Sequence, residues 1–253
     1  MSAENEFLLD AMDWSYSRVS SFDQCPRMFD LTYLQCATKV DNAFAQWGTL
    51  AHSILERYFL GRAELWDLST LYDAEYGAVV TEQFPYHAME RSYYERGLEY
   101  FCDFDGRISD ENRVLDVERR YSSSIGGRPV VGVIDLVVEN PHGLVVCDHK
   151  SRGRWKSRAE RRNYLRQLNL YAIRVKEEYG EYPNALWFNK FREGIVDREP
   201  FSRTLCQEDR DWFLRSIDSI YQAEQFQAKP DQFFCDFICS VREHCEHSVC
   251  GRS

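Results

Sequence analysis

The sequence predicts an α/β domain, because strand-like and helix-like segments alternate along its central part. Two apolar, β-branched runs at 131–138 and 143–147 flank a turn at 140–143, which is the pattern of a β-hairpin. A helix is expected after the hairpin, at about 158–178, since its apolar residues recur at helical spacing. The other expected strands are 114–121, 185–191 and 194–201.

Each run of the hairpin carries an acid among apolar residues, Asp135 in the first and Asp148 in the second. Side chains alternate along a strand, so Asp148 and Lys150 share one face and His149 points to the other. A carboxylate in an apolar strand needs a partner because unpaired burial is costly. Two carboxylates that converge beside a lysine suggest a divalent cation, and oxygen ligands suit Mg²⁺ or Mn²⁺. The alternative is a surface hairpin with a salt bridge.

The composition is that of a folded protein with a real core. The chain has 253 residues, 44% of them hydrophobic, which suffices for one large domain or two small ones. No apolar run approaches the roughly 20 residues that span a bilayer. The first residues are acidic and lack the basic region of a signal peptide, so we expect a cytoplasmic protein without a membrane partner. In that setting nine cysteines favour a metal or cluster site, or buried thiols, over disulfides.

The charge of the chain is unevenly distributed. A net charge of −10 argues against a protein that coats nucleic acid, but not against an enzyme with one local basic groove. Between residues 150 and 166 only Glu160 opposes a run of basic side chains. These are Lys150, Arg152, Arg154, Lys156, Arg158, Arg161, Arg162 and Arg166. The run begins at the hairpin lysine.

The N-terminal region predicts two short helices. Ser17 is a plausible N-cap for the first, and Pro26 ends or restarts the helix. Cys25 lies directly before this proline. Taken alone, it fits a buried cysteine in a helical hairpin, because free cysteines are among the most buried residues.

Three further regions are expected to be helical. On the helix at 44–60, His52 and Glu56 are four residues apart and project from one side. Residues 64–104 are rich in aromatic residues and carry no chemical motif, so they predict a helical insertion. A long helix is expected at about 208–227.

On the helix after the hairpin, Gln167 and Tyr171 are also neighbours at i and i+4.

The C-terminal segment at 235–250 is rich in cysteine. Its spacing is Cys235-x3-Cys239-x5-Cys245-x4-Cys250, and this density is hard to explain as core packing. A zinc site built from these cysteines alone is one interpretation, because Cys₄ sites suit zinc.

The strand expected at 114–121 carries Glu118, to which we assign no role as a ligand.

Several of these motifs also occur, in the same order, in a known family. The motifs are Ser15-x-Ser17 with Cys25-Pro26-Arg27, Gly48-x3-His52, Asp135 with Asp148-x-Lys150, Gln167-x3-Tyr171 and the cysteine segment. Each is weak alone, but their joint occurrence in this order is improbable by chance. Over residues 17–250 the chain resembles the PD-(D/E)XK nuclease superfamily, in particular its RecB-like and CRISPR-associated iron–sulfur exonucleases. The Cys235-x3-Cys239 interval is one residue longer than is usual there.

The resemblance implies a single nuclease domain over residues 1–253. Its core would have the order αβββαβ and a central mixed sheet, with flanking helices and a helical insertion at 64–104. The resemblance also implies a [4Fe–4S] cluster that joins the two termini. Its ligands would be Cys25, Cys235, Cys239 and Cys245, with Cys250 as the alternate. Zn²⁺ at the tail cysteines remains the alternative.

The resemblance further implies the roles of the site residues. The ligands of Mg²⁺ or Mn²⁺ would be His52, Asp135, Asp148 and the backbone carbonyl of His149. Lys150 would position the attacking water. Gln167 and Tyr171 would lie close to the active site and the DNA. The DNA backbone would be held by Arg152, Arg154, Lys156, Arg158, Arg161 and Arg162, without sequence information.

The implied activity is that of a metal-dependent deoxyribonuclease that hydrolyses phosphodiester bonds. We expect an exonuclease on single-stranded DNA or DNA ends, of prokaryotic or phage origin, acting in recombination, DNA repair or CRISPR adaptation with proteins of those pathways. A structure-specific endonuclease of the same fold is one alternative. A DNA-binding or assembly subunit without turnover is the other, although intact Asp135, Asp148 and Lys150 argue against it.

Overall fold

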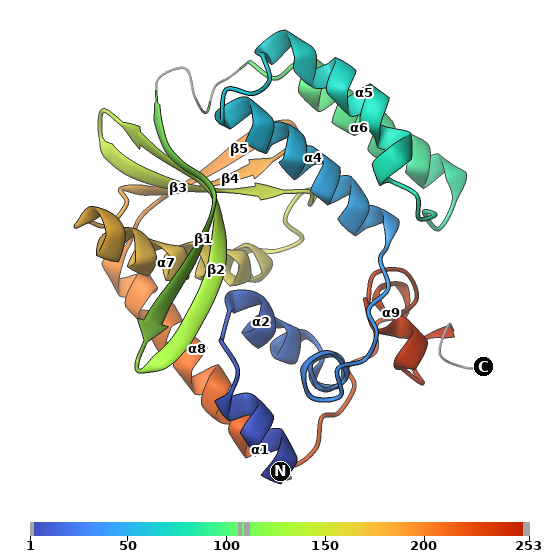
Figure 1. Cartoon of the computed structure of the whole chain (residues 1–253), viewed down its shortest axis with the longest axis vertical. Helices are drawn as coiled ribbons and strands as arrows, with labels where there is room; N and C mark the ends of the chain where they lie inside the picture. Colours follow the sequence, from blue (N-terminus) through green and yellow to red (C-terminus); the bar gives the residue numbers. More distant parts are fainter. Residues whose placement is uncertain (1–2, 106–107, 109–111, 250–253) are drawn as a thin grey trace. The chain divides into compact units, whose positions relative to one another are not determined.

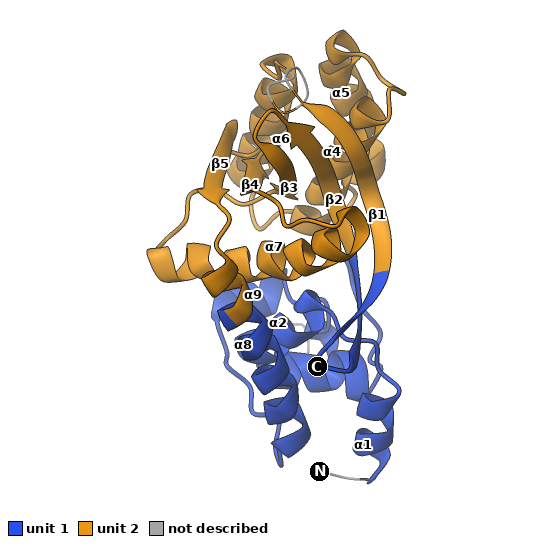
Figure 2. Cartoon of the chain, turned by 90° about the vertical axis from the view of Figure 1, so that its left-hand side faces the viewer, with its two compact units in different colours: residues 1–42, 122–132, 208–253 blue, residues 43–121, 133–207 orange. Residues whose placement is uncertain are grey.

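The computed structural model describes residues 3–105, 108 and 112–249 (Figure 1). The chain divides into two compact units, which are coloured separately in Figure 2. The first unit comprises residues 1–42, 122–132 and 208–253, and the second comprises residues 43–121 and 133–207. The expected single nuclease domain over residues 1–253 stays a prediction.

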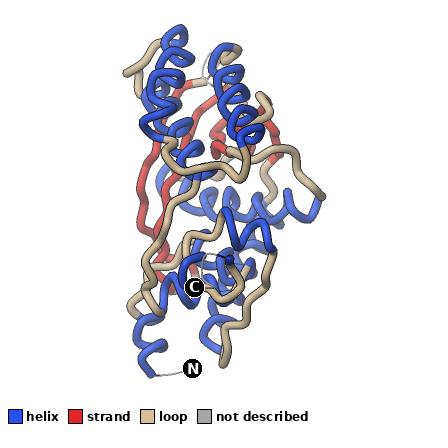
Figure 3. Tube along the Cα trace, turned by 90° about the vertical axis from the view of Figure 1, so that its right-hand side faces the viewer, coloured by secondary structure: helices blue, strands red, loops and turns tan. Residues whose placement is uncertain are grey.

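A five-stranded sheet, which appears in red in Figure 3, forms the centre of the second unit, while residues 122–132 at the end of its first hairpin belong to the first unit. Its strands are β1 (Arg113–Ile125), β2 (Arg128–Asn140), β3 (Gly143–Lys150), β4 (Ala185–Lys190) and β5 (Ile195–Pro200), in that spatial order. Strand β3 is antiparallel to β2 and parallel to β4, and β4 is antiparallel to β5. The sheet is therefore mixed, and the predicted α/β fold class is confirmed.

The register of β2 and β3 brings the two hairpin acids to the same place. The ladder ends at the pair Leu136 and Cys147. The next residue on each strand, in the direction of the open end, is an acid: Asp135 on β2 and Asp148 on β3. The turn at 140–143 fixes this register. The number of residues between Asp135 and Asp148 therefore places the two acids side by side.

Helices cover both faces of this sheet, as Figure 1 shows. On one face lie α4 (Ala43–Phe59), η2 (Leu65–Asp67), α5 (Leu68–Val79) and α6 (His87–Cys102). Their apolar side chains pack in one core with Leu136, Val145 and Cys147 of the sheet. On the other face α7 (Arg158–Tyr179) packs against Val146 and Leu186. The element order α4-β1-β2-β3-α7-β4 is the expected αβββαβ core, and the predicted insertion at 64–104 is helical.

The first unit is built from short helices. They are α1 (Ala3–Asp10), α2 (Tyr16–Gln24), α3 (Pro26–Phe29), η1 (Asp30–Leu34), α9 (Gln232–Phe237) and η3 (Arg242–His244), together with the C-terminal part of α8 (Arg203–Gln222). Pro26 occupies the first position of α3, so the predicted restart of the helix is confirmed. No described helix combines the length and the apolar character needed to cross a bilayer.

Two helix boundaries differ from the prediction. Ser15, and not Ser17, is the N-cap of α2, and its hydroxyl accepts the Arg18 N–H at 3.2 Å. The backbone of Ser15 is extended because the preceding residue, Trp14, bridges Val130, so the helix begins two residues earlier than predicted. Helix α8 covers 203–222 in place of 208–227.

Candidate active site

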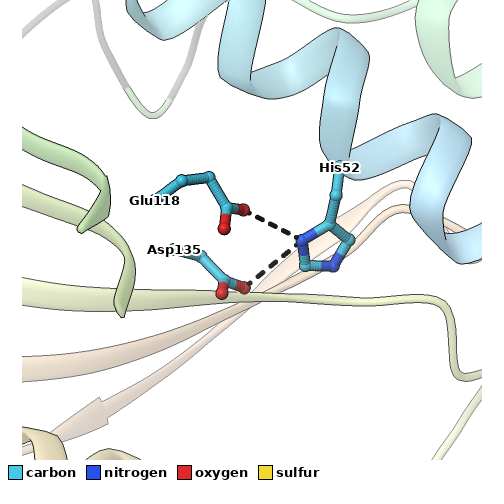
Figure 4. Close-up of side chains that lie close together, drawn as sticks. All are labelled: His52, Glu118 and Asp135. Carbon is cyan, nitrogen blue, oxygen red and sulfur yellow. Dashed lines mark hydrogen bonds and ion pairs between the residues drawn. The ribbon is translucent and has the colours of Figure 1, made fainter. Parts of the chain in front are cut away.

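Three side chains from three different elements meet at one edge of the sheet of the second unit. They are His52 from α4, Glu118 from β1 and Asp135 from β2, and one ligand atom of each lies within 4.8 Å of the others. His52 Nδ1 is 3.2 Å from Glu118 Oε1 and 3.8 Å from Asp135 Oδ2, as the dashed lines in Figure 4 mark. Among the described residues, this is a group that could hold a metal ion.

The second hairpin acid completes a cluster of buried carboxylates. Asp135 is 8% exposed and Asp148 only 2%. The backbone N–H of His149 donates a hydrogen bond of 2.7 Å to Asp135 Oδ2. Burial, followed by the negative charge of Asp148, raises the pKa of Asp135 to about 7, although His52 and Lys150 oppose this. The negative charge of Asp148 beside the buried Asp135 creates a demand for a cation at this place.

His52 supplies positive charge to this cluster. Its Nε2 lies 3.0 Å from the backbone carbonyl of His149, and its Nδ1 faces Glu118. Burial alone would lower the pKa of His52, but the hydrogen bond to Glu118 and the charge of Asp135 raise it above its ordinary value. Both ring nitrogens thus face oxygen acceptors, which favours the doubly protonated ring. One imidazole nitrogen and several hard oxygens form a donor set that fits Mn²⁺ or Mg²⁺. The cation would take the place of one proton of the His52 ring.

Lys150 connects Asp148 to the Gln-x3-Tyr motif on α7. Its Nζ lies 2.6 Å from Asp148 Oδ2 and donates a hydrogen bond of 3.0 Å to Gln167 Oε1. The Gln167 amide in turn donates to the Tyr171 hydroxyl at 2.7 Å. Burial alone would lower the pKa of Lys150, but Asp148 and Asp135 raise it, so the ammonium stays charged. The structure thus brings these four predicted residues into one chain of polar contacts.

His149 has the orientation expected from strand alternation. Its side chain is buried on the opposite face from Asp148 and Lys150, and its ring stacks on Phe59 of α4 with centroids 5.7 Å apart. Its backbone, however, contributes both an N–H and a carbonyl to the candidate site. The predicted carbonyl ligand therefore lies next to His52.

Glu118 is the residue that the sequence did not identify as a candidate ligand. It lies within β1 with φ of +46°, a left-handed conformation that is strained for a residue with a side chain. Such strain is concentrated at functional sites. The residue pattern did not indicate this backbone conformation, because the segment around Glu118 contains no glycine and has the pattern of a regular strand.

An open hollow of about 480 Å³ gives access to His52 and Glu118. Along α4 it is lined by Gly48, Thr49 and Glu56, and after β3 by Ser151. His52 and Glu56 therefore do project from one side of the helix, as predicted. A cation at the candidate site would be reachable by a substrate in this hollow.

The basic segment after β3 is more strongly paired than its sequence suggests. Arg152 contacts Glu160, and Arg154 lies 3.5 Å from Glu193 while its side chain remains 91% exposed. Lys156 and Arg158 are exposed, whereas Arg162 is half-buried. Segment 152–158 therefore keeps cationic side chains at the surface, next to the end of β3.

Arg161 has a different environment from its neighbours. It lies 2.9 Å from Asp197 Oδ1 and 2.8 Å from Glu199 Oε2, both on β5. The two carboxylates raise its pKa above the ordinary value. Its charge thus helps to fix α7 to the sheet, and its selection as a phosphate contact stays a prediction.

The first unit brings four of the predicted cluster cysteines together. Cys25, Cys235, Cys239 and Cys245 are all buried and line one small hollow. Burial, and the negative charges of the other cysteines, raise the pKa values of Cys235 and Cys239. The backbone N–H of Lys229 donates to Cys25 Sγ at 3.4 Å. The alternate ligand, Cys250, lies outside the described residues.

The αβββαβ order, with two acids and a lysine at the open end of a hairpin, places the second unit in the nuclease class that the sequence predicted. The model of the PD-(D/E)XK nuclease superfamily matches residues 13–246, and the chain belongs to this superfamily. A candidate exonuclease from Eubacterium rectale has a similar structure, with a TM-score of 0.53 and 15% sequence identity over 96% of this chain and 92% of that one. This likeness shows a shared fold. No curated protein sequence matches the chain.

Proposed function

We propose that the protein is a metal-dependent deoxyribonuclease of the RecB-like iron–sulfur type, acting as an exonuclease on single-stranded DNA or DNA ends. The observation that carries this proposal is the convergence of His52, Glu118 and Asp135 beside Asp148 and Lys150. The superfamily match supports hydrolysis of nucleic acid, and the exonuclease assignment of the structural neighbour agrees with it.

Four side chains and one carbonyl would hold Mg²⁺ or Mn²⁺. The side chains are His52, Glu118, Asp135 and Asp148, and the carbonyl is that of His149. When bound, such a cation stabilises the charge that develops on the phosphate and the leaving oxygen. Lys150 is placed to orient a water molecule, since Asp148 and Gln167 hold its ammonium in a fixed position.

The DNA backbone would lie across the hollow beside α4 and the exposed part of the basic segment. Arg154, Lys156 and Arg158 carry surface charge, and they follow directly from the strand that bears Lys150. Contacts of this kind neutralise phosphates without reading bases. We therefore propose a substrate that is recognised by its backbone and not by its sequence.

The buried cysteines of the first unit would hold a [4Fe–4S] cluster. Cys25, Cys235, Cys239 and Cys245 are all buried and line one hollow. Four cysteine thiolates are the usual ligand set of a [4Fe–4S] cluster. A zinc site at the tail cysteines is the alternative, because Cys₄ sites also suit zinc.

A comparison of linear and circular substrates tests the activity. Purified protein is incubated with Mn²⁺ and either 5′-labelled linear, 3′-labelled linear or circular single-stranded DNA, with Asp148→Ala as the matched control. Degradation of the linear forms alone, absent in Asp148→Ala, is expected. Cleavage of the circle would establish an endonuclease, and no Mn²⁺-dependent cleavage of any substrate would contradict the proposal.

A further inference from the structure

Behind the candidate metal site, three buried polar side chains form a hydrogen-bonded row. They are Tyr100 of α6, Asn189 of β4 and His149 of β3, with 7%, 1% and 4% of their surface exposed. The Tyr100 hydroxyl lies 3.1 Å from Asn189 Oδ1 and 2.8 Å from its Nδ2. Asn189 Nδ2 also lies 3.0 Å from His149 Nδ1. Tyr100 therefore donates to the amide oxygen, and the Asn189 amide nitrogen donates to both the Tyr100 hydroxyl and the imidazole.

The backbone of His149 is the link between this row and the candidate site. Its N–H donates to Asp135 Oδ2 at 2.7 Å, and its carbonyl accepts from His52 Nε2 at 3.0 Å. The two peptide groups meet at the Cα of His149, so rotation there would move both contacts. The His149 side chain is held by a hydrogen bond from Asn189 and by stacking on the Phe59 ring. The angle between the planes of the two rings is 6°.

A polar row at this position needs an explanation. The residues that precede His149 on the same face of β3 are Val145 and Cys147, both fully buried in the apolar core. An apolar side chain would avoid the desolvation of an imidazole and an amide. What the polar row adds is a fixed orientation, because a buried hydrogen bond is costly to break. An amide nitrogen can only donate, so His149 Nδ1 accepts the hydrogen bond from Asn189 Nδ2 at 3.0 Å.

We propose that Tyr100 and Asn189 are positioning residues that act through His149 to set the metal affinity of the site. The helical insertion thereby has a function beyond covering the sheet, since Tyr100 lies on its helix α6. This inference rests on the proposed metal-dependent activity. Partners that orient a metal ligand from behind typically change metal affinity by about 10–100-fold when removed.

The test measures Mn²⁺ binding directly, in the full-length protein without DNA. The dissociation constant is obtained from the electron paramagnetic resonance signal of free Mn²⁺ for wild type, Tyr100→Phe and Asn189→Leu. Tyr94→Phe is the matched control, because Tyr94 is also on α6 and its hydroxyl donates to Asp73, away from His149. Asp148→Ala is the variant that lacks a ligand. Melting temperatures of the metal-free proteins are recorded in parallel.

Tyr100→Phe and Asn189→Leu are expected to weaken Mn²⁺ binding by about tenfold or more, while Tyr94→Phe leaves it unchanged. Saturating Mn²⁺ should restore most of the cleavage rate of Tyr100→Phe. If both variants melt at lower temperature but bind Mn²⁺ as wild type does, the row is merely structural and the inference is overturned. Tyr100→Phe decides alone if Asn189→Leu does not fold. Wild type that binds Mn²⁺ no better than Asp148→Ala would instead overturn the proposed function.

Discussion

The ammonium of Lys150 donates a hydrogen bond of 3.0 Å to the side-chain oxygen of Gln167, a residue on the helix that packs under β3. The same ammonium lies 2.6 Å from Asp148. A lysine has four rotatable side-chain bonds, so one ion pair does not define where its ammonium lies. A second partner from a different element restricts it further, and Gln167 is itself held by Tyr171.

This relationship predicts unequal and non-additive effects of substitution. Lys150→Ala should lower the cleavage rate by about 10²–10³-fold, as loss of a preorganised charged group does. Gln167→Ala should cost about tenfold, because the ammonium remains but loses one restraint. The double variant should be no slower than Lys150→Ala, since Gln167 acts only through the lysine.

Single-turnover rates with excess enzyme measure this cycle. Lys176→Ala is the control, because Lys176 lies at the far end of the same helix and bonds the carbonyl of Gly180. Strictly multiplicative effects of the two substitutions would mean that Gln167 and Lys150 act independently.

Substitutions of Glu118 should affect metal binding and stability to different extents. Its φ of +46° is strained for any residue with a Cβ, whereas glycine adopts it freely. Glu118→Gly should weaken Mn²⁺ binding because a ligand is lost. It should change the free energy of unfolding by less than about 1 kcal/mol, since relief of strain offsets the flexibility of glycine.

Isothermal titration with Mn²⁺ and urea unfolding of the metal-free protein measure the two quantities. Glu118→Ala is the matched variant: it loses the same carboxylate but keeps the strain, and so should be the less stable of the two. Mn²⁺ affinity equal to that of wild type in both variants would remove Glu118 from the ligand set.

The exposed basic residues should determine the salt dependence of DNA binding. Replacing Arg154, Lys156 and Arg158 with Glu should weaken binding of single-stranded DNA. The slope of log K against log salt should become shallower, because each lost phosphate contact changes it by about 0.7. Fluorescence anisotropy at several salt concentrations, with Ca²⁺ to prevent cleavage, measures both. Arg91→Glu, which makes one such charge reversal at an exposed position of α6, serves as the control, and a triple variant indistinguishable from it would exclude this surface.

The ion pairs of Arg161 predict a pH dependence of stability. Burial alone would raise the pKa of Asp197, but hydrogen bonds from Arg161 and Trp155 lower it below the ordinary value. The unfolded state therefore binds a proton more readily than the folded state. The stabilisation is complete above the ordinary pKa of about 4 and is lost as the pH falls through the lowered value.

Urea unfolding of wild type and Asp197→Asn between pH 7 and pH 2.5 measures this contribution. We expect a difference of about 1 kcal/mol at pH 7, after screening by solvent, that shrinks toward zero at the acid end. A difference that does not vary with pH would show that the loss in Asp197→Asn is due to packing and not to charge.

Much of the core was predictable because the controlling interactions are local. The hairpin turn sets the register of β2 and β3, so the sequence distance between Asp135 and Asp148 already determines that they end side by side. Gln167 and Tyr171 follow from helical spacing. In the same way, alternation along β3 correctly assigned Asp148 and Lys150 to one face and His149 to the other.

What the sequence did not reveal depends on partners far along the chain. Arg161 looks like one member of a basic run, and only the position of β5 shows that Asp197 and Glu199 bind it. Tyr100 looks like a core aromatic residue, yet its hydroxyl bonds Asn189, 89 residues away. Glu118 differs from its neighbours in backbone conformation, which residue type does not encode. The N-cap moved from Ser17 to Ser15 because a contact with Val130 extends the chain there.

The cysteine-lined hollow of the first unit gives the last prediction. Protein purified without oxygen should be brown and carry four irons and four sulfides per chain, as expected for a [4Fe–4S] cluster. Its ligands should be Cys25 and three of the tail cysteines, with Cys235, Cys239 and Cys245 as first choice because they line one hollow with Cys25. Since the binding energy of a metal centre also stabilises the fold, Cys25→Ser should bleach the protein and lower its melting temperature.

Cys102→Ser is the matched control for this substitution. Cys102 is exposed at the end of α6, and Cys36 is likewise exposed, so neither is expected to bind the cluster. Visible absorption, iron and zinc analysis and thermal melting of Cys25→Ser, Cys102→Ser and Cys250→Ser measure the outcome. Cys250→Ser should keep the colour, because the four buried cysteines suffice as ligands. One zinc and no iron in wild type, retained in Cys25→Ser, would replace the cluster with a zinc site formed by the tail alone.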